Sequence, residues 1–213
     1  MFAKNRSELV QRAKAEIDFL LQKIPEFNTP SVISLGSGVC WHEILLSQRL
    51  EHTHVIATTH ISDDVKVIRD HLQKNFQQNN LSFEKLDLLK PNKNIADLSN
   101  GYTLLICGIM APFENNEIIE FVKFMAPDNI IVICKDGEYM RPMSVMKSFI
   151  YYLLSVISGQ ELIKMGYFRS KGEIYKIFNE KCGYKLKCQH QMPIKSVGGR
   201  QQLFQFIARD QEE

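Results

Sequence analysis

Short apolar runs alternate along this chain with apolar residues that recur at helical spacing. The runs have the length of buried strands in a parallel sheet, and they lie at residues 32–35, 54–59, 81–86, 102–107 and 129–134. Helical repeats follow three of the runs and predict helices at residues 41–50, 62–78 and 116–125. Such an alternation is typical of a parallel sheet that has helices on both faces.

The last part of the chain predicts a different arrangement. Ser170 and Glu173 stand at the spacing of a capping box, which begins a helix that Gly183 ends. Strands at 184–191 and 202–208 then form an antiparallel hairpin. The predicted fold class is therefore α/β: a doubly wound, seven-stranded, mostly parallel sheet with a C-terminal antiparallel hairpin and helices on both faces.

The first predicted strand leads into a glycine turn, Gly36-Ser37-Gly38, and a helix follows at once. Glycine permits a tight turn and a close approach of a ligand, and the N–H groups of the following helix favour an anionic group. A phosphate-binding P-loop would need a Gly-Lys-Ser/Thr ending, which is absent. A dinucleotide fingerprint would need a third glycine where Trp41 stands. The turn therefore favours another nucleotide-like ligand.

The turn resembles the first motif of class I S-adenosylmethionine-dependent methyltransferases, an acidic residue followed by three spaced glycines. Gly36 and Gly38 match it, while Ser34 stands in place of the acid and Cys40 in place of the last glycine. The order of predicted elements resembles this family over residues 31–210, including the terminal hairpin. The resemblance implies one methyltransferase-like domain over residues 1–213, with S-adenosyl-L-methionine as the cofactor.

In this family, residues that follow successive strands contact the cofactor. The resemblance therefore assigns cofactor binding to Gly36, Ser37, Gly38, Thr59, His60, Asp87, Leu88, Cys107 and Gly108. Thr59 and His60 stand where an acidic residue usually binds the ribose hydroxyls, and Asp87 matches the acid that contacts adenine. A turn aspartate is the alternative for Asp87. Cys107 and Gly108 would lie where the sulfonium faces the substrate. No catalytic residue is assigned.

Composition narrows the possible partners. The 26 basic and 24 acidic residues are mixed along the chain, with a net charge of +2 and no dense basic run, so no nucleic acid partner is expected. The five cysteines form no C-x-x-C pair, which indicates a reduced, cytoplasmic protein. No apolar stretch reaches the roughly 20 residues of a membrane span. The histidines lack metal-ligand spacing, so no metal site is expected.

Two helical segments flank the predicted core. Residues 9–24 carry an apolar helical pattern that Pro25 ends, and we expect a helical cap over residues 1–29. Residues 139–169 carry a Met-rich apolar stripe where small-molecule methyltransferases place a substrate lid. A helix pair that serves only as core or as a dimer surface is the alternative. The lid predicts a small, partly apolar substrate, and the oligomeric state stays open.

Two functional hypotheses follow from the sequence. The first is a methyltransferase that transfers a methyl group from S-adenosyl-L-methionine to a small molecule. The second is a catalytically inactive methyltransferase-like protein with a binding or interaction role. Ser34 and the missing acid after the second strand favour the inactive protein, whereas Gly36, Gly38 and Asp87 favour the enzyme.

Overall fold

The computed structural model describes residues 6–25, 27, 29–37, 40–59, 80–91, 101–110, 113–135, 169–196 and 199–209. The strands are β1 (Ser31–Leu35), β2 (His54–Thr59), β3 (Leu81–Lys85), β4 (Thr103–Cys107), β5 (Asn129–Lys135), β6 (Tyr184–Ser196) and β7 (Gly199–Ala208). The helices are α1 (Arg6–Lys23), α2 (Trp41–Arg49), α4 (Asn115–Met125), α6 (Lys171–Tyr175) and the π-helix η2 (Lys176–Lys181).

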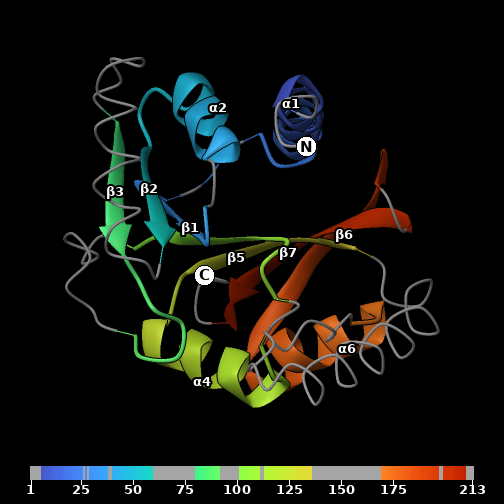
Figure 1. Cartoon of the computed structure of the whole chain (residues 1–213). Helices are drawn as coiled ribbons and strands as arrows, with labels where there is room; N and C mark the ends of the chain where they lie inside the picture. Colours follow the sequence, from blue (N-terminus) through green and yellow to red (C-terminus); the bar gives the residue numbers. More distant parts are fainter. Residues whose placement is uncertain are drawn as a thin grey trace, which may run out of the picture.

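Within the described residues, seven strands form one sheet in the order β3-β2-β1-β4-β5-β7-β6 (Figure 1). Strands β1 to β5 pair in parallel, and β7 pairs antiparallel with both β5 and β6. The predicted fold class, including the antiparallel hairpin, is confirmed. The hairpin is longer than predicted because register shifts let the pairing continue to Ser196 and Gly199.

Helices cover both faces of the sheet. Helices α1 and α2 lie over one face, where Leu20 packs in a core with Val55 and Leu105. Helices α4, α6 and η2 lie over the opposite face, where Phe121 and Phe178 are fully buried. Successive residues of a strand point to opposite faces, so the uninterrupted apolar runs of the central strands supply both cores.

The capping box predicted near the C-terminal end is confirmed. Ser170 Oγ accepts from the N–H of Glu173 at 3.3 Å, and Glu173 Oε2 accepts from the N–H of Ser170 at 2.7 Å. The helix that starts there continues as the π-helix η2, which the pattern did not predict, and Gly183 follows it with φ +84°. No described helix is long and apolar enough to cross a membrane.

Two predicted segments cannot be compared. The helix at 62–78 lies outside the described residues, and so does the proposed lid at 139–169 except for Arg169.

Candidate functional site

The order of the strands defines where a ligand site is expected. Strands β1 and β4 are neighbours, and the chain continues from them in opposite directions, to β2 and β3 on one side and to β5 on the other. Open α/β sheets bind ligands beyond the carboxyl ends of the strands at such a switch point. Leu35 and Ile106 are paired in register, so the residues that follow them, Gly36 and Cys107, flank the switch point from its two sides.

The glycine turn packs against the chain that leaves β4. Gly36 has φ +62°, which favours glycine. A Cβ on Gly36 would lie 1.7 Å from Cδ1 of Ile109. The backbone therefore favours glycine here, and a Cβ would also displace the end of the Ile109 side chain. Gly38 lies outside the described residues.

Ser37 ties the glycine turn to β2. Its N–H donates to the carbonyl of Thr58 at 2.8 Å, and its Oγ accepts from the N–H of Thr58 at 2.9 Å. Thr58 Oγ1 in turn donates to the carbonyl of Ser34 at 2.8 Å. Ser37 therefore fixes the shape of the turn. Thr59, at the end of β2, is buried, and His60 lies outside the described residues.

Asp87 follows β3 at the same edge of the sheet. Its Oδ1 accepts from the N–H of Leu89 at 2.9 Å, which is the bond of an Asx turn. Leu88 is half-buried and packs against the core on the α4 side. The structural role of Asp87 therefore uses one carboxylate oxygen in a turn next to the β2 end.

Cys107 ends β4 and Gly108 follows it, and the residues before and after Gly108 pack on opposite faces of the sheet. Cys107 packs with the core under α1 and α2, whereas Ile109 packs with the core over α4. Gly108 between them is exposed and has φ +71°, and no atom of the described part of the chain lies within 4 Å of the position of a Cβ. The main chain at Gly108 is thus open at the edge where a ligand is expected.

A carboxylate lies beside β1 although Ser34 is not acidic. Ser34 Oγ donates a hydrogen bond to Glu43 Oε1 from the first turn of α2. Glu43 is 2% exposed, and its Oε2 has no hydrogen-bond partner among the described residues. The N-terminal turn of a helix favours a negative charge. A carboxylate from the first turn of α2 therefore lies beside Ser34, nine residues later in the sequence.

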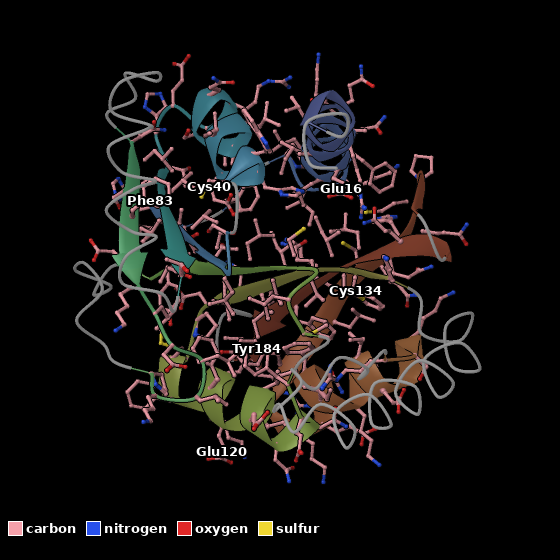
Figure 2. All side chains as sticks on the ribbon, viewed as in Figure 1. Glu16, Cys40, Phe83, Glu120, Cys134 and Tyr184 are labelled. Atoms are coloured by element: carbon pink, nitrogen blue, oxygen red, sulfur yellow. The ribbon has the colours of Figure 1, made fainter. Side chains whose placement is uncertain are left out.

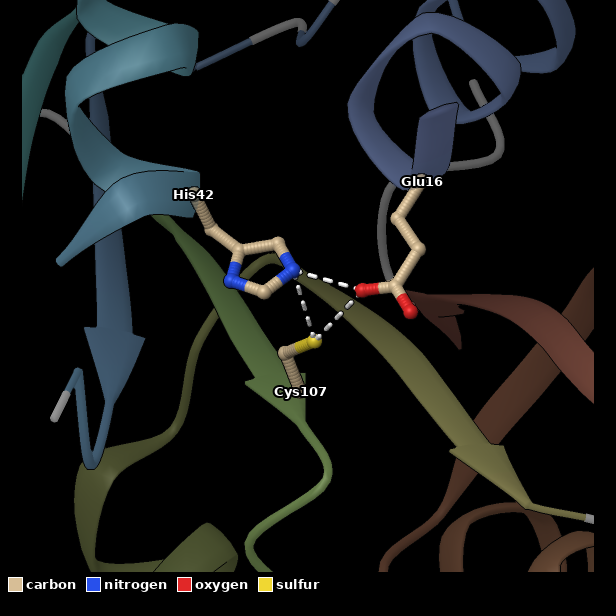
Figure 3. A group of neighbouring side chains, drawn as sticks. All are labelled: Glu16, His42 and Cys107. Atoms are coloured by element: carbon tan, nitrogen blue, oxygen red, sulfur yellow. Dashed lines mark hydrogen bonds and ion pairs between the residues drawn. The ribbon is translucent and has the colours of Figure 1, made fainter. Parts of the chain in front are cut away.

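Three further polar side chains meet under α1. Glu16 points from α1 toward the sheet (Figure 2), and its Oε2 lies 2.6 Å from His42 Nε2. Cys107 Sγ lies 3.7 Å from the same nitrogen and 4.0 Å from the same oxygen (Figure 3). We call Glu16, His42 and Cys107 the trio. Their three donor atoms lie within 4.8 Å of one another.

Neighbouring groups hold the Glu16 carboxylate in place. Its Oε1 accepts from Arg12 Nε and from Gln201 Nε2, both at 2.7 Å. Burial alone raises the pKa of Glu16, but hydrogen bonds from His42, Arg12 and Gln201 outweigh this and hold the pKa at about 2. Burial lowers the pKa of His42, but Cys107 and Glu16 outweigh it and raise the pKa to about 11. Glu16 and His42 therefore form an ion pair.

A buried arginine shapes the loop after β4. Arg169 is 5% exposed and donates to the carbonyls of Met110 at 2.7 Å and Phe113 at 2.5 Å. It also donates to Asn115 Oδ1 at 2.7 Å. One guanidinium thus fastens the segment between β4 and α4 to the start of the closing helix, because its planar fork presents donors in several directions.

Four residues of this region were not predicted from the sequence to belong to a site: Glu16, His42, Glu43 and Arg169. His42 lies 26 residues from Glu16 and 65 from Cys107, so no spacing motif connects the trio. A signal was nevertheless present at Glu16, which interrupts the apolar face of the leading helix formed by Ala13, Ile17 and Leu20. A charged residue on such a face indicates a buried polar contact.

The chain was compared with known proteins. No family model and no curated protein sequence matches it. Among solved structures, the methyltransferase domain of bacterial CtHen1 matches with a TM-score of 0.60 at 15% identity, over 93% of this chain and 99% of that chain. The mitomycin 7-O-methyltransferase MmcR matches with a TM-score of 0.64 at 12% identity, over 93% of this chain and 53% of that chain. PigF, solved with SAH, matches with a TM-score of 0.66 at 10% identity, over 93% and 56%.

The three structural matches differ in how much of the matched protein's chain is covered. This chain spans about half the length of MmcR and of PigF, and nearly all of the CtHen1 domain. At these identities the likeness shows the fold alone. The chain has the fold of the S-adenosylmethionine-dependent methyltransferases.

Proposed function

We propose that this protein is an S-adenosylmethionine-dependent methyltransferase that acts on a small, partly apolar molecule. The observation that carries the proposal is the position of the glycine turn, which lies at the β1/β4 switch point of a methyltransferase-type sheet. The fold alone would not carry it, because one fold serves many functions. The turn places the Gly36 backbone opposite the end of β4, where an adenosyl ligand of this fold class lies.

The cofactor is proposed to lie along the carboxyl edge of β1 to β4. Gly36, Ser37 and Gly38 would contact its methionine portion, Thr59 and His60 its ribose, Asp87 and Leu88 its adenine, and Cys107 and Gly108 its sulfonium side. The exposed, open main chain of Gly108 supports the last of these placements. Glu43 supports the first, because its buried carboxylate stands beside Ser34, where the family has its acid.

Transfer of the methyl group needs little side-chain chemistry. The sulfonium is already activated, so the protein has to align a nucleophile with the methyl carbon and exclude water. Alignment of this kind can contribute roughly 7–11 kcal/mol. The Arg169 contacts support the proposal, because they fix the loop that follows β4 and would shape the acceptor side.

Three observations support a small-molecule acceptor in a reducing compartment. The charge is mixed and lacks a basic run. MmcR, by its name, methylates an oxygen of mitomycin, a small molecule. No disulfide joins any of the five cysteines, all of which lie in the described residues, and this is expected of a cytoplasmic protein. The predicted lid at 139–169 would enclose the acceptor.

An inactive, methyltransferase-like binding protein is the second candidate. Ile109 favours it, because this side chain packs on Gly36 and explains the glycine without a ligand. Ser37 favours it too, since both its N–H and its hydroxyl are engaged with Thr58. Cofactor binding separates the two candidates.

Thermal unfolding with S-adenosylhomocysteine tests the proposal. A free ligand at 100 times its Kd stabilises a protein by about 2.7 kcal/mol. In a chain of this size that raises Tm by roughly 5–10 °C. Adenosine at the same concentration serves as the control and should raise Tm less. No shift with millimolar S-adenosylhomocysteine would favour the binding protein.

A further inference from the structure

The Glu16 oxygen, the His42 nitrogen and the Cys107 sulfur of the trio converge on one point, as the ligands of a metal ion do. A nucleophilic cysteine works in series with a histidine and an acid, which use the two different nitrogens of the imidazole. Here Glu16 Oε2 and Cys107 Sγ both approach Nε2, at 2.6 Å and 3.7 Å (Figure 3). The three side chains therefore do not form a proton relay through His42. Convergence of an oxygen, a nitrogen and a sulfur is an arrangement that can hold a metal ion.

The separations fit a small tetrahedral ion. Zinc bound to sulfur at about 2.3 Å, and to nitrogen and oxygen at about 2.0–2.1 Å, has tetrahedral edges of about 3.3–3.6 Å between its ligand atoms. The sulfur–nitrogen distance of 3.7 Å and the sulfur–oxygen distance of 4.0 Å are close to these edges. Only the hydrogen-bonded edge of 2.6 Å between Glu16 and His42 has to open, by about 0.7 Å.

The groups around Glu16 engage one of its carboxylate oxygens and leave the other available to an ion. Glu16 is 1% exposed, and Arg12 and Gln201 both donate to its Oε1. Carboxylates that bind metals are commonly held in this way through their other oxygen. The three ligands come from α1, α2 and β4, which are packed against one another, so the donor atoms are positioned by rigid elements.

We propose that Glu16 Oε2, His42 Nε2 and Cys107 Sγ bind a zinc ion and leave its fourth position open. A thiolate, an imidazole and one carboxylate suit zinc, whereas magnesium and calcium prefer oxygen ligands alone. The thiolate and the carboxylate together balance the charge of the ion. Zinc binds an imidazole nitrogen and a sulfur in their deprotonated forms, so binding of the ion should release protons. One of the ligands, Cys107, is the last residue of β4, so the site lies beside the proposed cofactor edge.

Cobalt provides a direct probe, because Co²⁺ replaces zinc and absorbs light when a thiolate binds it. The full chain is stripped with a chelator and titrated with Co²⁺ alone. We expect a thiolate-to-cobalt charge-transfer band that saturates at one ion per chain and disappears when Zn²⁺ is added. Cys107→Ser should abolish the band. Cys188→Ser, which alters another half-buried cysteine, should keep it.

A second measurement uses the wild-type chain only, so it stands even if Cys107→Ser fails to fold. The rate at which iodoacetamide alkylates each cysteine is followed by peptide mass spectrometry. Zn²⁺ should slow alkylation of Cys107 at least tenfold and leave Cys188 unchanged. Equal rates with and without Zn²⁺, or a cobalt band that persists in Cys107→Ser, would overturn the proposal. Neither readout uses S-adenosylhomocysteine, so the outcome is independent of the proposed methyl transfer.

Discussion

Replacement of Arg169 is expected to destabilise the protein, because it removes hydrogen bonds that hold the loop between β4 and α4. Arg169→Met keeps most of the volume of the buried stem but removes every donor of the guanidinium. The carbonyls of Met110 and Phe113 then lose a donor at 2.7 Å and 2.5 Å. Asn115 also loses its bond, but this side chain is exposed and water can replace the donor.

The expected size follows from the two carbonyls. The Met110 carbonyl still accepts from the N–H of Phe113 at 3.3 Å, so what each carbonyl loses is a hydrogen bond from a charged donor, which contributes about 1.5–3 kcal/mol. Removal of a buried charge from the interior recovers part of this, because the guanidinium no longer has to be desolvated. We therefore expect Arg169→Met to lower the free energy of unfolding by about 2–4 kcal/mol. For a chain of this size, this corresponds to a fall in Tm of roughly 5–15 °C.

Urea unfolding can measure this change. The single tryptophan, Trp41, reports by fluorescence, and circular dichroism reports the helices. Arg209→Met is the matched control, because Arg209 is exposed and makes one long bond of 3.3 Å to the carbonyl of Asn179. The control should stay within about 0.5 kcal/mol of wild type. A similarly small effect of Arg169→Met would refute the inference that these contacts hold the loop.

Three further predictions concern the site. Gly36→Ala should lower the free energy of unfolding by about 1–2 kcal/mol through its positive φ, and by more through the contact with Ile109; in urea unfolding, an Ile109→Ala background should reduce the loss. Asp87→Asn should weaken S-adenosylhomocysteine binding several-fold in calorimetry with stability nearly unchanged, because an amide oxygen can still accept in the turn; unaltered affinity would place the adenine elsewhere. With a chelator present, the ion pair of Glu16 and His42 should stabilise fully between pH 4.5 and 6.5, and lose its effect as pH falls toward 2 or rises toward 11. The stability difference between wild type and His42→Ala, measured by urea unfolding, should therefore shrink from pH 6.5 upward; a difference independent of pH would contradict the ion pair.

Periodicity was sufficient to predict the sheet. The central strands are buried on both faces, so their apolar runs are unbroken and their order along the chain implies parallel pairing. The hairpin was predicted from its turn, but its length was not. Its pairing continues across register shifts, such as that between Gln191 and Lys195, and a bulge has no periodic pattern in the sequence.

The candidate site was harder to predict, because its contacts are long-range. Glu43 could be read only as a first-turn acid of a helix until the fold brought it to Ser34. The residues of the trio lie up to 91 positions apart in the sequence, and a single sequence does not show that they are close in space. The glycine turn was local and was predicted, whereas its contact with Ile109 depends on the pairing of β1 with β4.

Gly108 connects the two proposed ligand sites. Cys107 before it joins the trio on one side of the sheet, and Ile109 after it packs on Gly36 at the other. The positive φ of +71° lets the chain change sides within three residues, and a Cβ would meet none of the residues that the structure describes. Gly108→Ala should therefore cost only the backbone strain, about 1–2 kcal/mol in urea unfolding.

The same substitution should act on both sites if the turn at Gly108 sets the positions of Cys107 and Ile109. We expect weaker cobalt binding by the trio and weaker binding of S-adenosylhomocysteine in Gly108→Ala. Gly36→Ala should affect only S-adenosylhomocysteine, because Gly36 contacts Ile109 and not the trio. Loss of one ligand alone in Gly108→Ala would show that the two sites do not depend on a common strand end.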